Sequence, residues 1–234
     1  MSCEQKLSAT AAARMIDISA VRTHHSYSDA EQLCALAKQH RFVGVHMLPC
    51  WTKQLAGMLA DCPDIYVGGP VGFPSGGQAT EIKLAEAAQL IADDVRELDI
   101  VMNIGKFLGR EQDYVLDELQ QIVSLAKPLG IATKVVIEMG VLPDYRLEAA
   151  CELAIESGAD YLKTGTGWIP GGADIERVAR VKQICGRKIK VKAAGGIRTP
   201  RQFLELYELG VERMGINATT AAEIIAYLGN ASKA

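Results

Sequence analysis

Residues 157–167 read Ser-Gly-Ala-Asp-Tyr-Leu-Lys-Thr-Gly-Thr-Gly, and the order of residue types in this stretch indicates how the chain folds. Residues 157–160 come directly after a helical pattern, and Gly158 stands just past the end of that helix, which is typical of a helix-to-strand turn. Tyr161 and Leu162 then begin a short apolar run that carries Lys163 and breaks into small residues and glycine. A buried strand that ends in this way delivers an ammonium group to the rim of a cavity.

The same layout returns at residues 190–196, Lys-Val-Lys-Ala-Ala-Gly-Gly, and apolar runs alternate with helical patterns along the chain. The strand candidates are the eight short apolar runs at residues 14–18, 42–45, 65–68, 97–102, 133–138, 161–163, 189–192 and 213–216. The clearest helical patterns, with apolar residues at three- and four-residue spacing, cover residues 79–95, 113–129, 144–156 and 174–185.

Eight strand candidates, each followed by a helix, fit one architecture best. The 234 residues divide into about 29 residues per unit, and eight parallel βα units in about 250 residues are typical of the (β/α)8 TIM barrel. A doubly wound sheet also alternates, but it usually has fewer strands, and no Gly-x-Gly-x-x-Gly follows the first run. We therefore predict an α/β fold with a single TIM-barrel domain over residues 1–234, including an N-terminal extension at 1–10 and a C-terminal tail at 230–234.

The composition excludes several classes of function. Hydrophobic residues make up 49% of the chain, charged residues 23%, and the net charge is -3, so no basic excess indicates a nucleic-acid partner. No apolar run approaches the roughly 18 to 20 residues that cross a bilayer, and the first six residues lack the layout of a signal peptide. The six cysteines show no Cys-x-x-Cys spacing, so we expect reduced thiols, no metal site and a cytoplasmic location.

In a TIM barrel the carboxyl ends of the strands form the functional face. The polar side chains that interrupt or end the apolar runs there are Asp17, His46, Asp99, Asn103, Glu138, Lys163 and Lys192. Buried charges are costly unless they are paired, so their convergence indicates a wet, functional pocket. Lys134, Val136 and Glu138 are every second residue of one strand candidate and could share one face. An internal ion-pair layer on that face fits the sequence as well as a catalytic role does.

Two lysines that face one pocket repel each other, and one of them should lose its proton near neutral pH. A neutral lysine is a nucleophile toward a carbonyl carbon, so the pair suggests Schiff-base chemistry. We expect Lys163 to be this nucleophile and Lys192 to lower its pKa from roughly 10.4 toward 7–8. Asp99 stands in mid-strand and needs a partner, for which a lysine is the natural choice. The structural alternatives are lysines that extend to solvent and a satisfied core salt bridge.

Two glycine-containing loops suggest a phosphate site. Residues 195–198, Gly-Gly-Ile-Arg, follow the seventh strand candidate, and residues 215–220, Gly-Ile-Asn-Ala-Thr-Thr, follow the eighth and start a helix. TIM barrels often bind a phosphate after these two strands, at backbone N–H groups and a helix N-terminus. The alternative is a pair of ordinary strand-to-helix turns.

At these residues the chain resembles the deoxyribose-phosphate aldolase family of class I aldolases, from about Asp17 to Thr220. The segments that carry the resemblance are Val71–Gly76 with Thr80 and Lys83, Glu97–Gly105, Lys134–Glu138, Gly158–Gly167 and Val191–Thr199. The last two are highly specific, because they are close to the family patterns GAD-hydrophobic-hydrophobic-KTSTG and VKASGGIRT.

The resemblance implies reversible aldol cleavage of 2-deoxy-D-ribose 5-phosphate to glyceraldehyde 3-phosphate and acetaldehyde. Lys163 would form the Schiff base, Lys192 would lower its pKa, and Asp99 would assist proton transfer and pair with Lys192. The substrate-binding residues expected at this face are Asp17, His46, Asn103, Thr166, Gly167, Gly195, Gly196, Arg198, Gly215 and Asn217. No cofactor and no metal are implied, since the protonated imine does the polarising that zinc does in class II aldolases. A small aldehyde or sugar phosphate would be the substrate, and the family resemblance suggests a homodimer.

The chain departs from the family pattern at several wall positions. His46 replaces the usual cysteine, Trp168 stands where the family often has phenylalanine or lysine, and Asn217-Ala218 replace small hydroxyl residues. Trp168 could occlude a phosphate or stack on a different substrate. Two alternatives therefore stay open: a Schiff-base aldolase for a different, unphosphorylated aldehyde or sugar, and a non-catalytic barrel with a binding or regulatory role.

Overall fold

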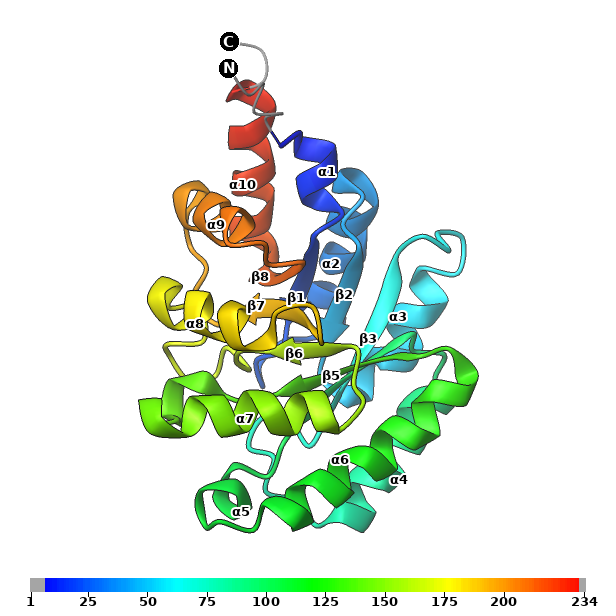
Figure 1. The fold of residues 1–234 in the computed structure, drawn as a ribbon. Helices are drawn as coiled ribbons and strands as arrows, with labels where there is room; N and C mark the ends of the chain where they lie inside the picture. The colour runs from blue at the N-terminus through cyan, green and yellow to red at the C-terminus, as the bar shows by residue number, and fades with distance from the viewer. Residues whose placement is uncertain (1–6, 232–234) are drawn as a thin grey trace.

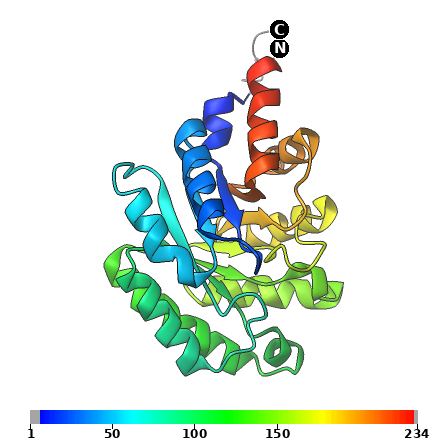
Figure 2. The ribbon, with the colours of Figure 1, turned by 180° about the vertical axis from the view of Figure 1, so that it is seen from behind.

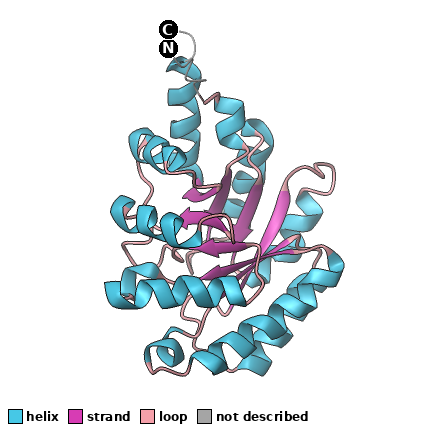
Figure 3. Ribbon diagram, in the orientation of Figure 1, coloured by secondary structure: helices cyan, strands magenta, loops and turns pink. Residues whose placement is uncertain are grey.

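Residues 7–231 are described by the computed structural model, and eight parallel strands in them close into a barrel that helices surround (Figures 1 and 3). The strands are β1 (Ile16–Ala20), β2 (Gly44–Met47), β3 (Tyr66–Val71), β4 (Glu97–Val101), β5 (Ala132–Val136), β6 (Tyr161–Lys163), β7 (Lys190–Ala194) and β8 (Arg213–Asn217). Each pairs with the next in sequence, and β8 returns to β1, with Met214 opposite Ile16. The predicted TIM barrel is therefore confirmed.

The helices lie outside the barrel, and all of them except α1 and α10 come between successive strands (Figures 1 and 2). The α-helices are α1 (Ala9–Ala13), α2 (Tyr27–His40), α3 (Thr52–Met58), α4 (Thr80–Ala92), α5 (Ile104–Leu108), α6 (Gln112–Ala126), α7 (Asp144–Glu156), α8 (Ile175–Cys185), α9 (Pro200–Glu208) and α10 (Ala218–Ala231). Short 3-10 helices cover Pro49–Trp51, Lys127–Leu129 and Met139–Val141.

The ends of the chain bring the first and last helices together. Helix α1 packs against α10 (Figure 2). Gly229 of α10 lies beside Ala9 of α1. Residues 1–6 of the expected N-terminal extension and residues 232–234 of the expected tail fall outside the described residues, whereas Ala9 and Thr10 belong to α1, and α10 continues to Ala231.

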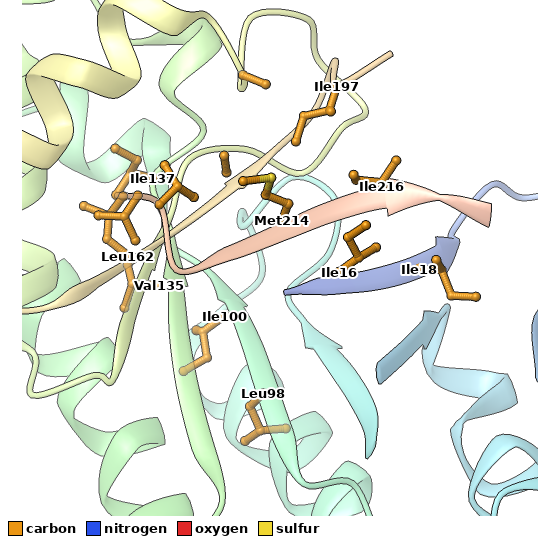
Figure 4. Packing of buried hydrophobic residues seen from close by; sticks show 14 of the residues in the cluster. Ile16, Ile18, Leu98, Ile100, Val135, Ile137, Leu162, Ile197, Met214 and Ile216 are labelled. Carbon is orange, nitrogen blue, oxygen red and sulfur yellow. The ribbon is translucent and has the colours of Figure 1, made fainter. Parts of the chain in front are cut away.

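Side chains that alternate along each strand face two different interiors, the layer between strands and helices and the inside of the barrel. Side chains at every second position of a strand point to the same face, and in β1 the buried Ile16 and Ile18 pack in the layer between the strands and the helices. Leu98 and Ile100 of β4 do the same (Figure 4). Asp17 and Asp99 occupy the intervening positions and face the barrel axis. The apolar core is therefore a ring around the barrel, while charged side chains enter the barrel itself.

Local signals explain where the helices begin and end. Helix α8 begins after Asp174, whose carboxylate accepts a hydrogen bond from the Arg177 N–H at 2.9 Å, and α9 begins with Pro200 after the N-cap Thr199. The glycine expected just past α7 is Gly158, which has a φ of +78° that other residues rarely adopt. Because all eight strands are parallel, the loops that follow them lie together at one end of the barrel.

Candidate active site

A cavity of about 190 Å³ opens at the carboxyl ends of the barrel strands. The predicted site residues that line it are Asp17, His46, Asp99, Lys163, Thr166, Gly167, Lys192, Gly195, Gly196, Arg198, Gly215 and Asn217. Asn103 does not line it, because its side chain turns away to cap α5 and accepts a hydrogen bond from the Lys106 N–H at 3.2 Å. Asn217 similarly accepts a hydrogen bond from the Thr220 N–H at the start of α10.

Asp99 in β4 is the point at which three lysines meet. Its Oδ2 lies 2.7 Å from Nζ of Lys163 and 3.0 Å from Nζ of Lys192, and its Oδ1 lies 3.1 Å from Nζ of Lys134. The lysines come from β5, β6 and β7, which follow β4 around the barrel, so their inward-facing positions converge on one carboxylate. Two of these lysines face the cavity, and Lys134 lies beneath them.

Asp17 in β1 contacts Lys192 from the other side. Its Oδ1 lies 2.9 Å from the Lys192 Nζ, and its Oδ2 accepts a hydrogen bond from the Tyr66 hydroxyl at 3.0 Å. That hydroxyl accepts one in turn from the Arg213 guanidinium at 2.6 Å. Lys192 is therefore held between two carboxylates at 1% exposure, whereas Lys163, at 8%, is the more accessible of the two lysines in the cavity.

An ion-pair layer fills the barrel interior below the cavity. Lys134 pairs with Glu97, and an Nη atom of Arg213 lies 3.8 Å from Oε1 of Glu97. Both cations also lie over the faces of Tyr66 and Tyr161. The internal ion-pair layer that the sequence left open for Lys134 is present at this level of the barrel.

Glu138 does not continue that layer. Strand β5 ends at Val136, and Glu138 adopts a left-handed backbone with a φ of +47°. Its buried carboxylate instead accepts hydrogen bonds from the backbone N–H and the hydroxyl of Thr166. Burial raises the pKa of the Glu138 carboxyl. Glu138 therefore fixes the loop after Lys163 from below.

Charge and burial act against each other in this cluster. Burial alone would raise the pKa of the Asp99 carboxyl, but the three ammonium groups around it hold that pKa well below its ordinary value. The carboxyl of Asp17 is also buried, and the Lys192 ammonium keeps its pKa low. Burial lowers the pKa of Lys192 to about 8, although both carboxylates act to raise it. Lys192 can therefore exchange its proton close to neutral pH.

His46 carries no charge at neutral pH. Burial, and then the charge of Lys192, lowers the pKa of its imidazole to about 3. Its Nε2 lies 3.8 Å from Asp17 and its Nδ1 lies 3.9 Å from Asp99, both beyond hydrogen-bond distance. The ring also fills the space next to Gly68, where a Cβ would lie 1.9 Å from it. His46 thus narrows the cavity floor as a neutral side chain.

One group among residues 7–231 has the chemistry of metal ligands. Donor atoms of Asp17, His46 and Glu97 lie within 4.8 Å of one another. Lys192 already neutralises the first carboxylate and Lys134 the second. The two carboxylates therefore serve as partners of ammonium groups, and these buried cations disfavour a metal ion at the same place.

The glycine loops approach one another at the cavity mouth. A Cβ on Gly195 would lie 3.2 Å from the backbone of Gly167, and one on Gly172 would lie 2.2 Å from the carbonyl oxygen of Ala194. Gly196 has a φ of +120°, which only glycine adopts readily. The loops after β6 and β7 can lie this close because they have no side chains there, which leaves backbone groups open to a ligand.

Arg22, Phe73 and Trp168 form a group of contacting side chains at the mouth that the sequence did not predict. The Arg22 guanidinium lies 5.2 Å from the centre of the Trp168 ring, and the Phe73 ring meets that ring edge-on at 5.9 Å. Arg22 and Phe73 line the cavity, as do Ser19 and His25. No periodicity marks such residues, because they stand on loops after β1, β3 and β6.

Comparison with known proteins gives one consistent set of relatives. No family model matches the chain. The deoxyribose-phosphate aldolase of Klebsiella pneumoniae is 39% identical over 218 residues, covering 92% of this chain and 87% of the relative. That of Carboxydothermus hydrogenoformans is 36% identical over 91% of this chain and 93% of its own length.

Solved structures agree with these relatives. An aldolase described as QR15 superposes with a TM-score of 0.85 at 31% identity, covering 92% of this chain and 96% of its own. A tetrameric deoxyribose phosphate aldolase from Aeropyrum pernix gives a TM-score of 0.86 at 27% identity, with 94% and 91% covered. Among residues 7–231, no helix is both long and apolar enough to cross a membrane.

Proposed function

We propose that this chain, which belongs to the deoxyribose-phosphate aldolase family, is a lyase that reversibly cleaves 2-deoxy-D-ribose 5-phosphate to glyceraldehyde 3-phosphate and acetaldehyde. The observation that carries the proposal is the Asp99 carboxylate, which bridges Lys163 and Lys192 at the floor of a cavity. A buried lysine pair around one carboxylate supplies an amine and a proton-exchanging group within reach of each other.

Lys163 is the proposed nucleophile because it is the more exposed lysine of the pair. Its unprotonated amine adds to the C1 aldehyde carbon, and the resulting carbinolamine loses water to give a protonated imine. A base removes the proton of the C3 hydroxyl, whose oxygen then forms the new carbonyl as the C2–C3 bond breaks. The electron pair of that bond forms the C1–C2 double bond, and the π pair of the protonated imine moves onto its nitrogen. Glyceraldehyde 3-phosphate leaves, and an enamine remains on Lys163. Protonation of the enamine carbon and hydrolysis of the imine release acetaldehyde.

Lys192 and Asp99 are the proposed proton-transfer groups. A pKa of about 8 allows Lys192 to give and regain a proton near neutral pH. Its ammonium can protonate the departing hydroxyl of the carbinolamine, while Asp99 holds both lysine nitrogens in place. His46 is neutral and shapes the cavity floor, so we assign it no charge in these steps.

The phosphate is proposed to bind at the cavity mouth. Gly167, Gly195, Gly196 and Arg198 line the cavity from the loops after β6 and β7, and the glycines leave backbone N–H groups accessible. Gly215 lies deeper, within β8, where a Cβ would be 3.2 Å from the Lys192 side chain. Thr166 and Asp17 complete the proposed substrate walls deeper in the cavity. A second candidate is the same Schiff-base chemistry on an unphosphorylated aldehyde or sugar, because Trp168 and Asn217 depart from the family pattern near the mouth.

Borohydride trapping tests the Schiff base. The protein is incubated with acetaldehyde, reduced and digested, and peptide mapping should place an N-ethyl group on Lys163. Replacing the exposed Lys188 by alanine serves as the control that leaves the adduct in place. The proposal fails if Lys163 carries no adduct, or if lysines are labelled without preference. Cleavage of deoxyribose 5-phosphate and of deoxyribose, measured side by side, then separates the two candidate substrates.

Assembly and location also belong to the proposal. The family resemblance supports a homodimer, while the Aeropyrum pernix neighbour is described as tetrameric. Light scattering of the purified protein decides between these states. We propose a cytoplasmic location, which fractionation of expressing cells tests.

A further inference from the structure

Two arginines at the cavity mouth lack a carboxylate partner among residues 7–231. Arg198 donates to the backbone carbonyl of Ile197, and Arg22 donates to that of Gly167. The carboxylates that line the cavity, Asp17 and Asp99, lie deeper and are paired with lysines. The mouth therefore carries two uncompensated positive charges, and a cavity with this polarity attracts an anionic group to its outer end.

Arg22 is held in a fixed orientation by the loop after β6. Its Nη2 donates to the Gly167 carbonyl at 2.8 Å, and its guanidinium lies on the Trp168 ring. The backbone N–H of Arg22 donates to Nδ1 of His25 at 3.0 Å, which fixes the start of the side chain as well. A guanidinium has five N–H donors, so most of them remain available to a ligand.

Trp168 completes a reciprocal connection between the two loops. Its indole Nε1 donates to the Val21 carbonyl at 3.1 Å, opposite in direction to the bond from Arg22 to Gly167. Its backbone N–H donates to the Thr166 hydroxyl at 3.0 Å, and the Phe73 ring packs edge-on against it. Trp168 therefore supports Arg22 beside the cavity, and its ring does not project freely into the mouth.

We propose that Arg22 is a specificity-determining residue that binds the phosphate of the substrate from the β1 side of the mouth, beside Gly167 and together with Arg198. This inference rests on the proposed function. Guanidinium groups suit the role because their planar donors match phosphate oxygens in pairs. Trp168 acts through Arg22 as a positioning residue, which gives the bulky indole a role in phosphate binding.

The competing explanation is structural, because Arg22 also connects two loops. A merely structural role would lower activity toward every substrate alike. A phosphate-binding role lowers kcat/KM for deoxyribose 5-phosphate more than for deoxyribose. The ratio of these two values is therefore the informative quantity.

The experiment measures that ratio in the wild type, Arg22→Gln, Arg22→Lys and Arg187→Gln. Arg187 is exposed in the turn before β7, at the opposite end of the barrel, so its variant removes the same charge away from the cavity. We expect Arg22→Gln to lower the ratio about 10-fold or more, as loss of a charge-assisted hydrogen bond does. Arg22→Lys should retain part of the preference, and Arg187→Gln all of it.

An unchanged ratio in Arg22→Gln, or an equal loss with both substrates, would overturn the assignment of Arg22. So would a loss of the same size in Arg187→Gln. The acetaldehyde adduct on Lys163 is trapped in parallel in each protein. If the wild type forms the adduct and cleaves deoxyribose 5-phosphate, but Arg22→Gln has the same ratio of kcat/KM values as the wild type, only this inference fails. If the wild type forms no adduct, the proposed function itself fails.

Discussion

Replacing Asp17 by asparagine tests how the barrel sets the proton affinity of Lys192. The Asp17 carboxylate is 1% exposed, and its Oδ1 lies 2.9 Å from the Lys192 Nζ. Asparagine keeps the shape and the acceptor oxygen for the Tyr66 hydroxyl but removes the negative charge. The substitution thus isolates the electrostatic contribution of one contact.

The sign and size of the effect follow from the contacts. Burial lowers the pKa of Lys192 to about 8, while Asp17 and Asp99 act to raise it. Loss of an opposite charge at this distance shifts a pKa by about 1 to 3 units, so the pKa of Lys192 should fall to between about 5 and about 7. A step that needs the Lys192 ammonium then declines as the pH rises through that lower range instead of through about 8.

The assay is kcat/KM for cleavage of deoxyribose 5-phosphate from about pH 5 to about pH 9, because this parameter reports groups of the free enzyme. We expect the midpoint of the alkaline limb to move down by about one unit or more in Asp17→Asn. Asp94→Asn, at an exposed turn before β4, is the control and should leave the midpoint in place. A midpoint in Asp17→Asn at or above that of the wild type would refute the reasoning.

Three further substitutions separate chemistry from stability. Lys192→Leu should lower kcat about 100-fold or more and remove the alkaline limb, because a proton-transfer group is lost; a pH–rate profile with the limb intact would contradict this. Lys163→Ala should abolish turnover while circular dichroism and thermal unfolding show a folded barrel; residual cleavage at the wild-type rate would exclude it as nucleophile. Lys134→Met should lower the free energy of unfolding by about 3 to 5 kcal/mol in urea, since Glu97 and Asp99 lose a buried partner; a loss below about 1 kcal/mol would show that the layer reorganises.

The fold could be predicted from the sequence because strand and helix periods differ and both are visible. The helix predicted at residues 144–156 matches α7, and the one predicted at 79–95 is α4, which ends three residues earlier at Ala92. The turn from helix to strand at Gly158 was equally readable, since its conformation favours glycine. Such signals are local. Eight strand candidates in sequence, each followed by a helix, are compatible with few closed topologies.

The site was only partly predictable because its contacts depend on strand register. That Asp99 needs a cationic partner follows from burial alone, but its contact with Lys134 as well as with the two cavity lysines depends on how β4 and β5 pair. Asn103 was expected to bind substrate, yet a local hydrogen bond to the next helix takes up its side chain oxygen. The contact of Arg22 with Trp168 joins loops far apart in sequence, and no residue pattern announces it.

The ion-pair network inside the barrel has a consequence for the chemistry of the amine. Four cationic side chains, Lys134, Lys163, Lys192 and Arg213, share three carboxylates, Asp17, Glu97 and Asp99. The cluster is electrically neutral only when one of its lysines has given up a proton. A buried cluster favours neutrality, and this excess of one positive charge agrees with the lowered pKa of Lys192. The proton affinity of the amine is in that sense a property of the charge balance of the whole interior, and adding or deleting one carboxylate there should change it.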